Sequence, residues 1–121
     1  ILGTGGASKA IAYALKKLNI EYQFVSRKDG ATYNYNSLTP EIIAAHTIII
    51  NCTPVGTFPN IDGCPDIPYE AINEQHLLYD LIYNPAATKF LQLGEQQGAA
   101  TKNGQEMLEL QAEASWTVWN L

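Results

Sequence analysis

The first ten residues hold a glycine-rich turn of the kind that binds phosphate groups. They read Ile-Leu-Gly-Thr-Gly-Gly-Ala-Ser-Lys-Ala, so a short apolar strand runs into glycines and then into a predicted helix. Gly3 lets the chain turn sharply off the strand, while Gly5 and Gly6 keep side chains away from an approaching pyrophosphate. The free N–H groups and the dipole at the helix start would attract that anion. This pattern predicts the beginning of a dinucleotide-binding βαβ unit; the alternative is a glycine-rich turn without a ligand.

A basic turn follows the second predicted strand, residues 22–26. In NAD-binding units the end of this strand usually presents an acidic residue to the ribose 2′-hydroxyl. Here Ser26, Arg27 and Lys28 come first, and the nearest acid is Asp29. A hydroxyl and an arginine fork would hold a 2′-phosphate, which a carboxylate would repel. The sequence therefore favours NADP over NAD, against the alternative of a solvated Arg-Lys pair in a turn.

Strand-forming and helix-forming segments alternate along the chain. Apolar or β-favouring runs predict strands at residues 1–2, 22–26, 31–35, 47–51, 77–81 and 98–101, with the run at 47–51 covered on both faces. Apolar spacing predicts helices at 7–18, 86–97 and 104–120, and a short helix through Ala45 that Thr39 caps and Pro40 begins. Prolines make residues 57–69 an irregular loop. This alternation predicts an α/β fold of Rossmann type, a doubly wound parallel sheet in the order 3-2-1-4-5-6, as one domain over residues 1–121.

Ligands bind such sheets beyond the carboxyl ends of the strands, where the strand order reverses. Four segments are expected to converge there: the glycine turn, residues 26–28, residues 51–56 and the turn after Asp80. Their convergence strengthens the prediction of a dinucleotide site.

Composition excludes several other classes of function. With 7 basic and 12 acidic residues the net charge is −5, which argues against nucleic-acid binding. No apolar run is long enough to span a bilayer, so no membrane partner is expected. Cys52 and Cys64 lack metal-ligand spacing and are interpreted as reduced thiols of a cytoplasmic protein. His46 and His76 have no neighbours that suggest a metal site or acid–base chemistry, so no metal is expected.

The chain begins without methionine and with only the end of its first strand. A first strand of this fold usually has five or six residues. We therefore expect a fragment of a longer protein.

The last predicted helix carries two side chains that need an explanation. Gln111 lies in a broad apolar face, where a buried amide needs hydrogen-bond partners. Backbone groups or a polyhydroxylated ligand would both satisfy it. Trp116 lies on the acidic face and is either a contact for a further domain or an exposed aromatic residue.

Taken together, these motifs resemble the NADP-binding domain of the shikimate dehydrogenase family, over nearly the whole chain. The resemblance lies in Gly-Thr-Gly-Gly-Ala-Ser-Lys (3–9), Ser-Arg-Lys (26–28), Asn-Cys-Thr-Pro-Val-Gly (51–56), Tyr-Asp-Leu-Ile-Tyr-Asn-Pro (79–85) with Thr88 and Phe-Leu (90–91), and Asn-Gly-Gln-Glu-Met-Leu (103–108) leading to Gln-Ala (111–112). It implies reversible NADPH-dependent reduction of 3-dehydroshikimate to shikimate, in aromatic amino-acid biosynthesis.

The resemblance also assigns roles to residues. It implies that the pyrophosphate is held by Gly3, Thr4, Gly5, Gly6 and Ala7, and the adenosine ribose with its 2′-phosphate by Ser26, Arg27 and Lys28. It places Thr53 near the cofactor, Leu81 and Gly104 on the nicotinamide side, and Tyr83 and Gln111 against the substrate. The family commonly has Asn-Arg-Thr or Asn-Arg-Ser where this chain has Ser26-Arg27-Lys28, which changes the contacts on the adenine side.

No residue of this chain matches a catalytic residue of the family. The family's catalytic lysine and aspartate belong to an N-terminal domain that precedes the matched region, and nothing around Lys9 or Asp80 marks either for proton transfer. The fragment alone is therefore expected to be inactive and to need that domain as a partner. Two alternatives stay open, a quinate-preferring or NAD-using relative and a dinucleotide-sensing module without catalysis.

Overall fold

The computed structural model describes residues 1–27 and 31–106. Its elements are α1 (Gly6–Lys17), η1 (Tyr35–Ser37), α2 (Pro40–Ala45), β1 (Ile48–Asn51), η2 (Tyr69–Ala71), β2 (Leu77–Asp80), α3 (Lys89–Gln96) and β3 (Ala100–Lys102). Helices and parallel strands both occur along the chain, as the sequence predicts for an α/β fold, although α1, η1 and α2 follow one another without a regular strand between them. The predicted final helix, with Gln111 and Trp116, lies outside the described residues apart from its first turn.

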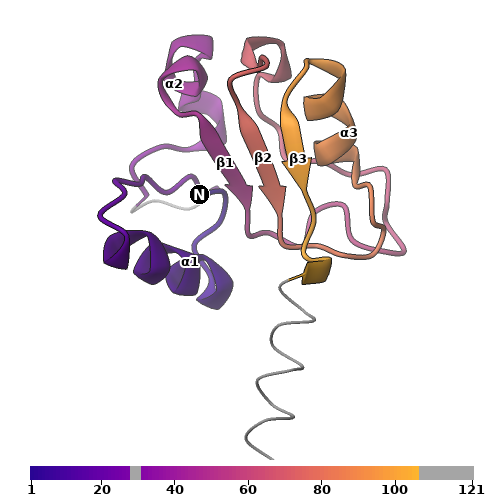
Figure 1. Cartoon of the computed structure of the whole chain (residues 1–121), viewed down its shortest axis with the longest axis horizontal. Helices are drawn as coiled ribbons and strands as arrows, with labels where there is room; N and C mark the ends of the chain where they lie inside the picture. The colour runs from indigo at the N-terminus through magenta and orange to yellow at the C-terminus, as the bar shows by residue number, and fades with distance from the viewer. Residues whose placement is uncertain (28–30, 107–121) are drawn as a thin grey trace, which may run out of the picture.

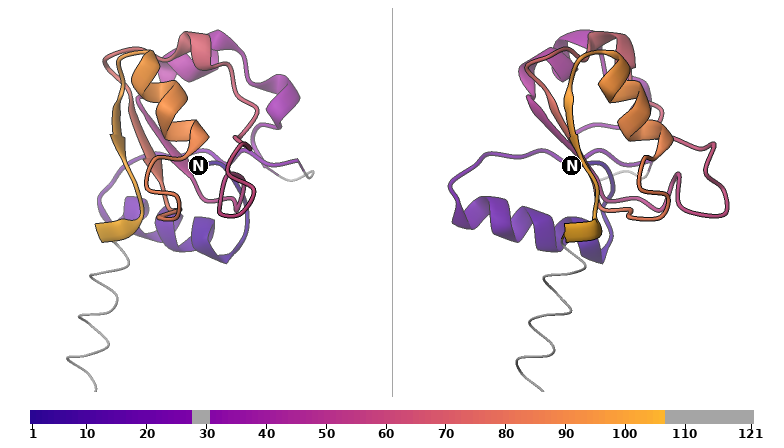
Figure 2. Two further views of the ribbon diagram at one scale, coloured as in Figure 1. Left: turned by 90° about the vertical axis from the view of Figure 1, so that its right-hand side faces the viewer. Right: turned by 45° about the vertical axis from the view of Figure 1, so that its right-hand side comes forward.

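The strands β1, β2 and β3 form a parallel sheet in that order (Figure 1). Figure 2 shows α2, η2 and α3 on one side of these strands, while α1 lies near the end to which the strand arrows point. The core lies between the sheet and this helical layer and is made of Leu2, Val25, Ile43, Ile49, Ile67, Ile72, Leu78, Phe90, Leu91 and Ala99. Buried aliphatic and aromatic surface of this kind supplies the main favourable term in folding.

Beside β1, three segments meet through single parallel bridges. Leu2 pairs with both Asn51 and Val25, and Val25 pairs in turn with Tyr33. The predicted strands at residues 22–26 and 31–35 are therefore wrong as regular strands, because each is reduced to one bridging residue. Residues 35–37 instead form η1, since Asn34 Oδ1 accepts from the Ser37 N–H at 2.8 Å and Ser37 Oγ accepts from the Asn34 N–H at 3.0 Å.

Helix caps explain where two helices begin. The prediction that Thr39 caps α2 is confirmed, because its hydroxyl accepts from the Ile42 N–H at 3.3 Å and Pro40 takes the first position. The predicted helix start at residue 86 is wrong, because Thr88 is the N-cap and α3 begins at Lys89.

The prediction that both faces of the strand at residues 47–51 are covered holds only in part. Ile49 and Ile50 are buried, but Ile48 keeps 45% of its surface exposed among the described residues, so β1 is not covered on both faces there.

His76 is structural: it is 3% exposed, its Nδ1 accepts from the Asn73 N–H, and its Nε2 lies 2.9 Å from the Ile43 carbonyl oxygen. The ring therefore ties the segment before β2 to α2.

Within residues 1–27 and 31–106, no helix is long and apolar enough to cross a membrane. In the same residues, no group of three or more His, Cys, Asp or Glu side chains is arranged to hold a metal ion.

Candidate dinucleotide site

The glycine turn lies directly against the loop that follows β1. Gly3 has φ of +112°, a conformation that residues with a Cβ rarely adopt, and a Cβ there would lie 3.3 Å from Thr53 Cγ2. Backbone bonds fix both segments, because the Gly3 N–H donates to the Val25 carbonyl at 2.8 Å and the Cys52 N–H to the Leu2 carbonyl at 2.9 Å. A residue with a Cβ at position 3 would adopt a strained backbone conformation and press against Thr53.

The start of α1 is open toward the end of the sheet. Gly5 is the N-cap residue, and among the described residues no side chain caps the first turn. A Cβ added at Gly5 or Gly6 would meet nothing within 4 Å, so packing inside the chain does not require glycine there. The Ser8 hydroxyl points inward and donates to the Gly5 carbonyl at 2.6 Å. The first N–H groups of α1 are thus available to an anion.

A cavity of about 260 Å³ lies at this turn, where four chain segments meet. It is lined by Gly3, Thr4, Ser26, Arg27, Tyr35, Thr53, Pro54 and Val55. The Thr4 and Ser26 hydroxyls, which both line it, form a hydrogen bond of 3.4 Å. The structure therefore brings together the glycine turn, the end of the second predicted strand and the loop after β1, as expected.

A neighbouring cavity of about 400 Å³ shares Arg27, Tyr35 and Val55 with the first. Burial raises the pKa of the Tyr35 hydroxyl, and the nearby Arg27 guanidinium opposes this shift. Arg27 thus lies between two cavities with an aromatic ring beside it, and Lys28 falls outside the described residues. Sequence patterns predict a strand over residues 31–35, so they do not indicate Tyr35 as a cavity residue; the structure places it in η1.

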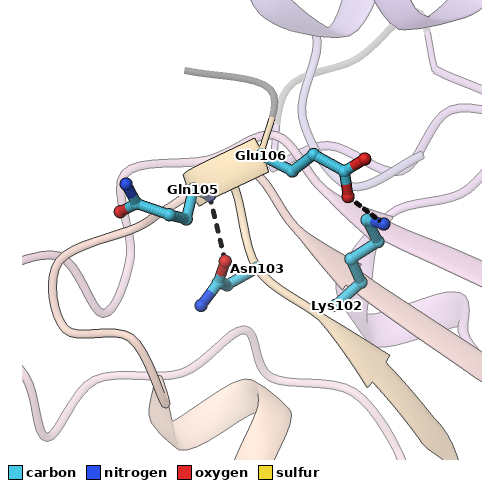
Figure 3. A network of polar contacts seen from close by, with 4 residues as sticks. All are labelled: Lys102, Asn103, Gln105 and Glu106. Carbon is cyan, nitrogen blue, oxygen red and sulfur yellow. Dashed lines mark hydrogen bonds and ion pairs between the residues drawn. The ribbon is translucent and has the colours of Figure 1, made fainter. Parts of the chain in front are cut away.

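The loop after β2 lies in close contact with the segment after β3. A Cβ at Gly104 would overlap the Leu81 carbonyl oxygen, and the Gly104 N–H donates to the Ile82 carbonyl at 3.1 Å. Asn103 Oδ1 accepts from the Gln105 N–H at 3.0 Å, next to the ion pair between Lys102 and Glu106 (Figure 3). The structure thus places Leu81 and Gly104 together.

The two residues expected to contact the substrate are Tyr83 and Gln111, and the structure describes only the first. Tyr83 is 48% exposed on the same loop as Leu81. Gln111 lies outside the described residues. The Asn103 side chain also donates to the Ala86 carbonyl at 2.9 Å, which fastens the far end of the Tyr83 loop.

A fully buried polar network lies at the base of the loop after β1 and the loop after β2, and sequence reasoning missed this network. Asn51, Asp80 and Thr88 each have no exposed surface. Asp80 Oδ1 accepts from Asn51 Nδ2 and the Ile82 N–H, both at 3.1 Å, and its Oδ2 accepts from the Thr88 hydroxyl at 2.7 Å. The sequence does contain one signal of this network, because Asn51 and Asp80 each end an apolar strand. A carboxylate buried at such a position must be hydrogen-bonded, so partners for Asp80 could have been expected.

Cys52 is not a reactive thiol. Burial raises its pKa to about 11, and the Asp80 carboxylate adds to this rise. Cys52 and Cys64 are both unpaired. Neither cysteine forms a disulfide in this structure, as expected for reduced thiols.

Curated relatives match this chain along almost its whole length. A shikimate dehydrogenase (NADP(+)) of Methanococcus maripaludis is 37% identical over 98% of this chain and 48% of the relative. One of Caldicellulosiruptor saccharolyticus is 35% identical over the same shares. The chain therefore spans about half the length of the curated relatives it matches. No protein-family model matches the chain.

Solved structures give the same result for the fold. Shikimate dehydrogenase from Aquifex aeolicus superposes with a TM-score of 0.83 at 27% identity, covering 98% of this chain and 46% of the other. The enzyme from Thermus thermophilus in complex with NADP(H) and shikimate gives 0.78 at 26% identity, covering 98% and 47%. The α/β fold of Rossmann type is thereby confirmed. By sequence and by structure, this chain is thus similar, over 98% of its own length, to about half the length of shikimate dehydrogenases.

Proposed function

We propose that residues 1–121 form the NADP-binding domain of a shikimate dehydrogenase. The whole protein would catalyse the reversible NADPH-dependent reduction of 3-dehydroshikimate to shikimate in aromatic amino-acid biosynthesis. The observation that carries this proposal is the 260 Å³ cavity between the glycine turn and Arg27, in a chain related to NADP-dependent enzymes over 98% of its length.

The residues around this cavity fit the phosphates of NADP. The open N-terminus of α1, with Gly3, Thr4, Gly5, Gly6 and Ala7, would hold the pyrophosphate. Arg27 and Ser26 would hold the ribose 2′-phosphate, because a guanidinium binds phosphate through paired charge-assisted hydrogen bonds. Lys28 is adjacent in sequence and would add a second cation. A 2′-hydroxyl alone would leave Arg27 without this partner, so NADP is preferred over NAD.

The other half of the cofactor would extend toward the loop after β2. We assign Leu81 and Gly104 to the nicotinamide side, which their mutual contact supports. Tyr83 and Gln111 would contact the substrate. The bound cofactor supplies the hydride, whereas this chain orients its two ends and keeps the ring against the loop.

No residue of this chain is assigned to proton transfer. We propose that the catalytic lysine and aspartate lie in a separate N-terminal domain of a cytoplasmic enzyme, which agrees with the half-length match to the relatives. Under this proposal the 121 residues bind the cofactor without turning over the substrate.

We further infer that the sheet continues in the order 3-2-1-4-5-6. The bridges from Tyr33 to Val25, from Val25 to Leu2 and from Leu2 to Asn51 support this order, and β1, β2 and β3 complete it. The glycine turn would then lie at the point where the strand order reverses, where dinucleotides bind.

Titration of the chain with NADP⁺ and with NAD⁺ by isothermal calorimetry tests the function. We expect NADP⁺ to bind at least about tenfold more tightly, and Arg27→Ala to abolish this preference, because a charge-assisted hydrogen bond contributes about 1.5–3 kcal/mol. Lys16→Ala removes a cation in the last turn of α1, away from the cavity, and serves as the control. Equal binding of both cofactors, or an unchanged preference in Arg27→Ala, would refute the 2′-phosphate assignment. Binding by an intact full-length protein without turnover would favour the dinucleotide-sensing alternative.

A further inference from the structure

The buried carboxylate of Asp80 connects the two loops that form the candidate site. On one side, Asn51 donates to Asp80 and its own Oδ1 accepts from the Thr53 N–H at 3.0 Å and the Thr53 hydroxyl at 2.6 Å. On the other side, Asp80 accepts from the Ile82 N–H and from Thr88, which caps α3 through the Leu91 N–H. One side chain thus joins the loop after β1 to the loop after β2.

A second set of contacts ties the same two loops together further from the sheet. The Asn84 carbonyl accepts from the Phe58 N–H at 2.9 Å and lies 3.4 Å from the Thr57 hydroxyl oxygen. The two loops are therefore held at both ends, through Asp80 inside and Asn84 outside. Any shift at Asp80 has to be absorbed by the residues between these points, which include Thr53 and Leu81.

Thr53 does not offer its hydroxyl to the cavity. The hydroxyl donates to Asn51 and accepts from the Val55 N–H at 3.3 Å, so the methyl group is directed toward the glycine turn. Thr53 therefore sets the shape of the cavity wall beside Gly3, and its position depends on Asn51 and, through Asn51, on Asp80.

We propose that Asp80 is a positioning residue for cofactor binding, which holds Thr53 against the glycine turn and fixes the loop that carries Leu81. This inference rests on the proposed function of NADP binding. A carboxylate is needed because three donors converge on two oxygens that both accept. An asparagine amide accepts at one oxygen only and would set its N–H₂ group against at least one of these donors.

The test compares the NADP⁺ dissociation constants of folded variants by isothermal calorimetry, with circular dichroism to establish that each is folded. Asp80→Asn and Thr88→Val each remove one acceptor or donor from the network at nearly constant volume, and we expect each to weaken NADP⁺ binding about tenfold. Thr88→Ser keeps the hydroxyl and should bind within twofold of the wild type. Asp62→Asn, which changes an exposed carboxylate in the 57–69 loop, is the matched control and should also stay within twofold.

A double-mutant cycle shows whether Asp80 acts through Thr53. If it does, Asp80→Asn combined with Thr53→Val should weaken binding by less than the product of the two single effects. Asp80→Asn combined with Arg27→Ala should be multiplicative, because Arg27 is not part of the network. A multiplicative result for the Thr53 pair would overturn the route through Thr53.

The outcomes separate this inference from the proposed function. If the wild type binds NADP⁺ and both Asp80→Asn and Thr88→Val bind it equally well, the inference is wrong and the proposed function stands. If the wild type binds no NADP⁺, the proposed function fails, and the inference fails with it. If Asp80→Asn does not fold, the difference between Thr88→Val and Thr88→Ser decides, since equal affinity in that pair would refute the role of the network.

Discussion

Arg27 and Asp80 carry opposite charges and lie in opposite surroundings. Arg27 lines an open cavity, where its guanidinium has room for an anion, whereas Asp80 is fully buried and all its hydrogen bonds are made within the chain. Under the proposed function, the exposed charge of Arg27 would bind the ligand, whereas the buried charge of Asp80 would hold the loops around it. Tyr35 and Cys52, which also titrate, are both partly buried, between the exposed Arg27 and the fully buried Asp80.

The pKa of Asp80 gives a pH-dependent prediction. Burial raises this pKa above 3.8, and the bonds from Thr88, Ile82 and Asn51 offset part of the rise. The folded state thus holds the proton more tightly than the unfolded state, so the contribution of Asp80 to stability is fully present below the unfolded pKa and is lost as the pH rises through the folded pKa. We expect the free energy of unfolding of the wild type, minus that of Asp80→Asn, to decrease as the pH rises from about 4.

Urea unfolding of both proteins at pH 4, 5, 6 and 7 measures this difference. The prediction concerns how the difference in free energy of unfolding between the wild type and Asp80→Asn changes with pH, and not its sign at any one pH. A difference that grows with pH would show that hydrogen bonding outweighs burial at Asp80. Asp62→Asn, compared with the wild type in the same way, controls for the general effect of removing one negative charge.

Cys52 gives a prediction about chemical reactivity. With a pKa of about 11, on the order of one molecule in a thousand carries the thiolate at pH 8. In a Cys64→Ser variant, we expect Cys52 to react with iodoacetamide about ten- to a hundredfold more slowly than a free cysteine, since the higher nucleophilicity of a basic thiolate offsets part of the deficit. Unfolding in urea should remove this protection. A rate at pH 8 equal to that of free cysteine would refute the assignment.

At the scale of elements, the site depends on how loops leave the strands. The first turn of α1, the loop after β1 and the loop after β2 all start at the same end of the sheet, which is where a parallel sheet gathers its connections. Each loop is fixed close to its strand, by Gly3, by Asn51 and by Asp80 respectively. The elements thus supply positions, and the side chains at their ends supply the contacts.

Two glycines make a matched pair of predictions at this scale. Gly6 opens α1 with free space around it, so Gly6→Ala should leave the free energy of unfolding unchanged or raise it by up to about 1 kcal/mol. If the pyrophosphate binds at this turn, as proposed, the added methyl would hinder its approach, and we expect NADP⁺ affinity to fall at least about tenfold. Gly104→Ala should instead lower both, because its methyl overlaps the Leu81 carbonyl.

Urea unfolding and calorimetric titration of the two variants separate these effects. A Gly6→Ala chain that binds NADP⁺ like the wild type would remove α1 from the cofactor site. A Gly104→Ala chain as stable as the wild type would show that the loops after β2 and β3 can move apart without cost.

At the scale of the whole molecule, the cavity joins segments that are far apart in sequence. Its walls come from residues 3–4, 26–27, 35 and 53–55, so a ligand seated there contacts four separate parts of the chain. Binding to the folded state alone must then stabilise the fold. We expect NADP⁺ at one hundred times its dissociation constant to raise the free energy of unfolding by about 2.7 kcal/mol.

Urea unfolding with and without NADP⁺ tests this linkage. The same NADP⁺ concentration should give a smaller shift with Arg27→Ala, in proportion to its weaker binding. An unchanged unfolding midpoint for the wild type, at a concentration that calorimetry shows to be saturating, would contradict binding to the folded state only.

Local signals in the sequence determined the order and type of most elements. The helix cap at Thr39, the apolar run at residues 47–51 and the glycine turn each act through neighbours a few residues away, so their residue types are readable without a fold. The family resemblance, carried by the glycine turn and by motifs such as residues 26–28, 51–56 and 79–85, extended these predictions to the cofactor, and the relatives are named as NADP(+)-dependent.

The strand boundaries, the position of Tyr35 and the hydrogen-bond partners of Asp80 depend instead on tertiary contacts. Asp80 finds Asn51 across 29 positions and Thr88 across 8, and nothing local in the sequence shows which donors reach a buried carboxylate. Likewise, Tyr35 leaves the predicted strand because Asn34 and Ser37 cap each other and form η1. Periodicity and capping are local properties of the chain, whereas burial and hydrogen-bond partners depend on which distant segments the fold brings together.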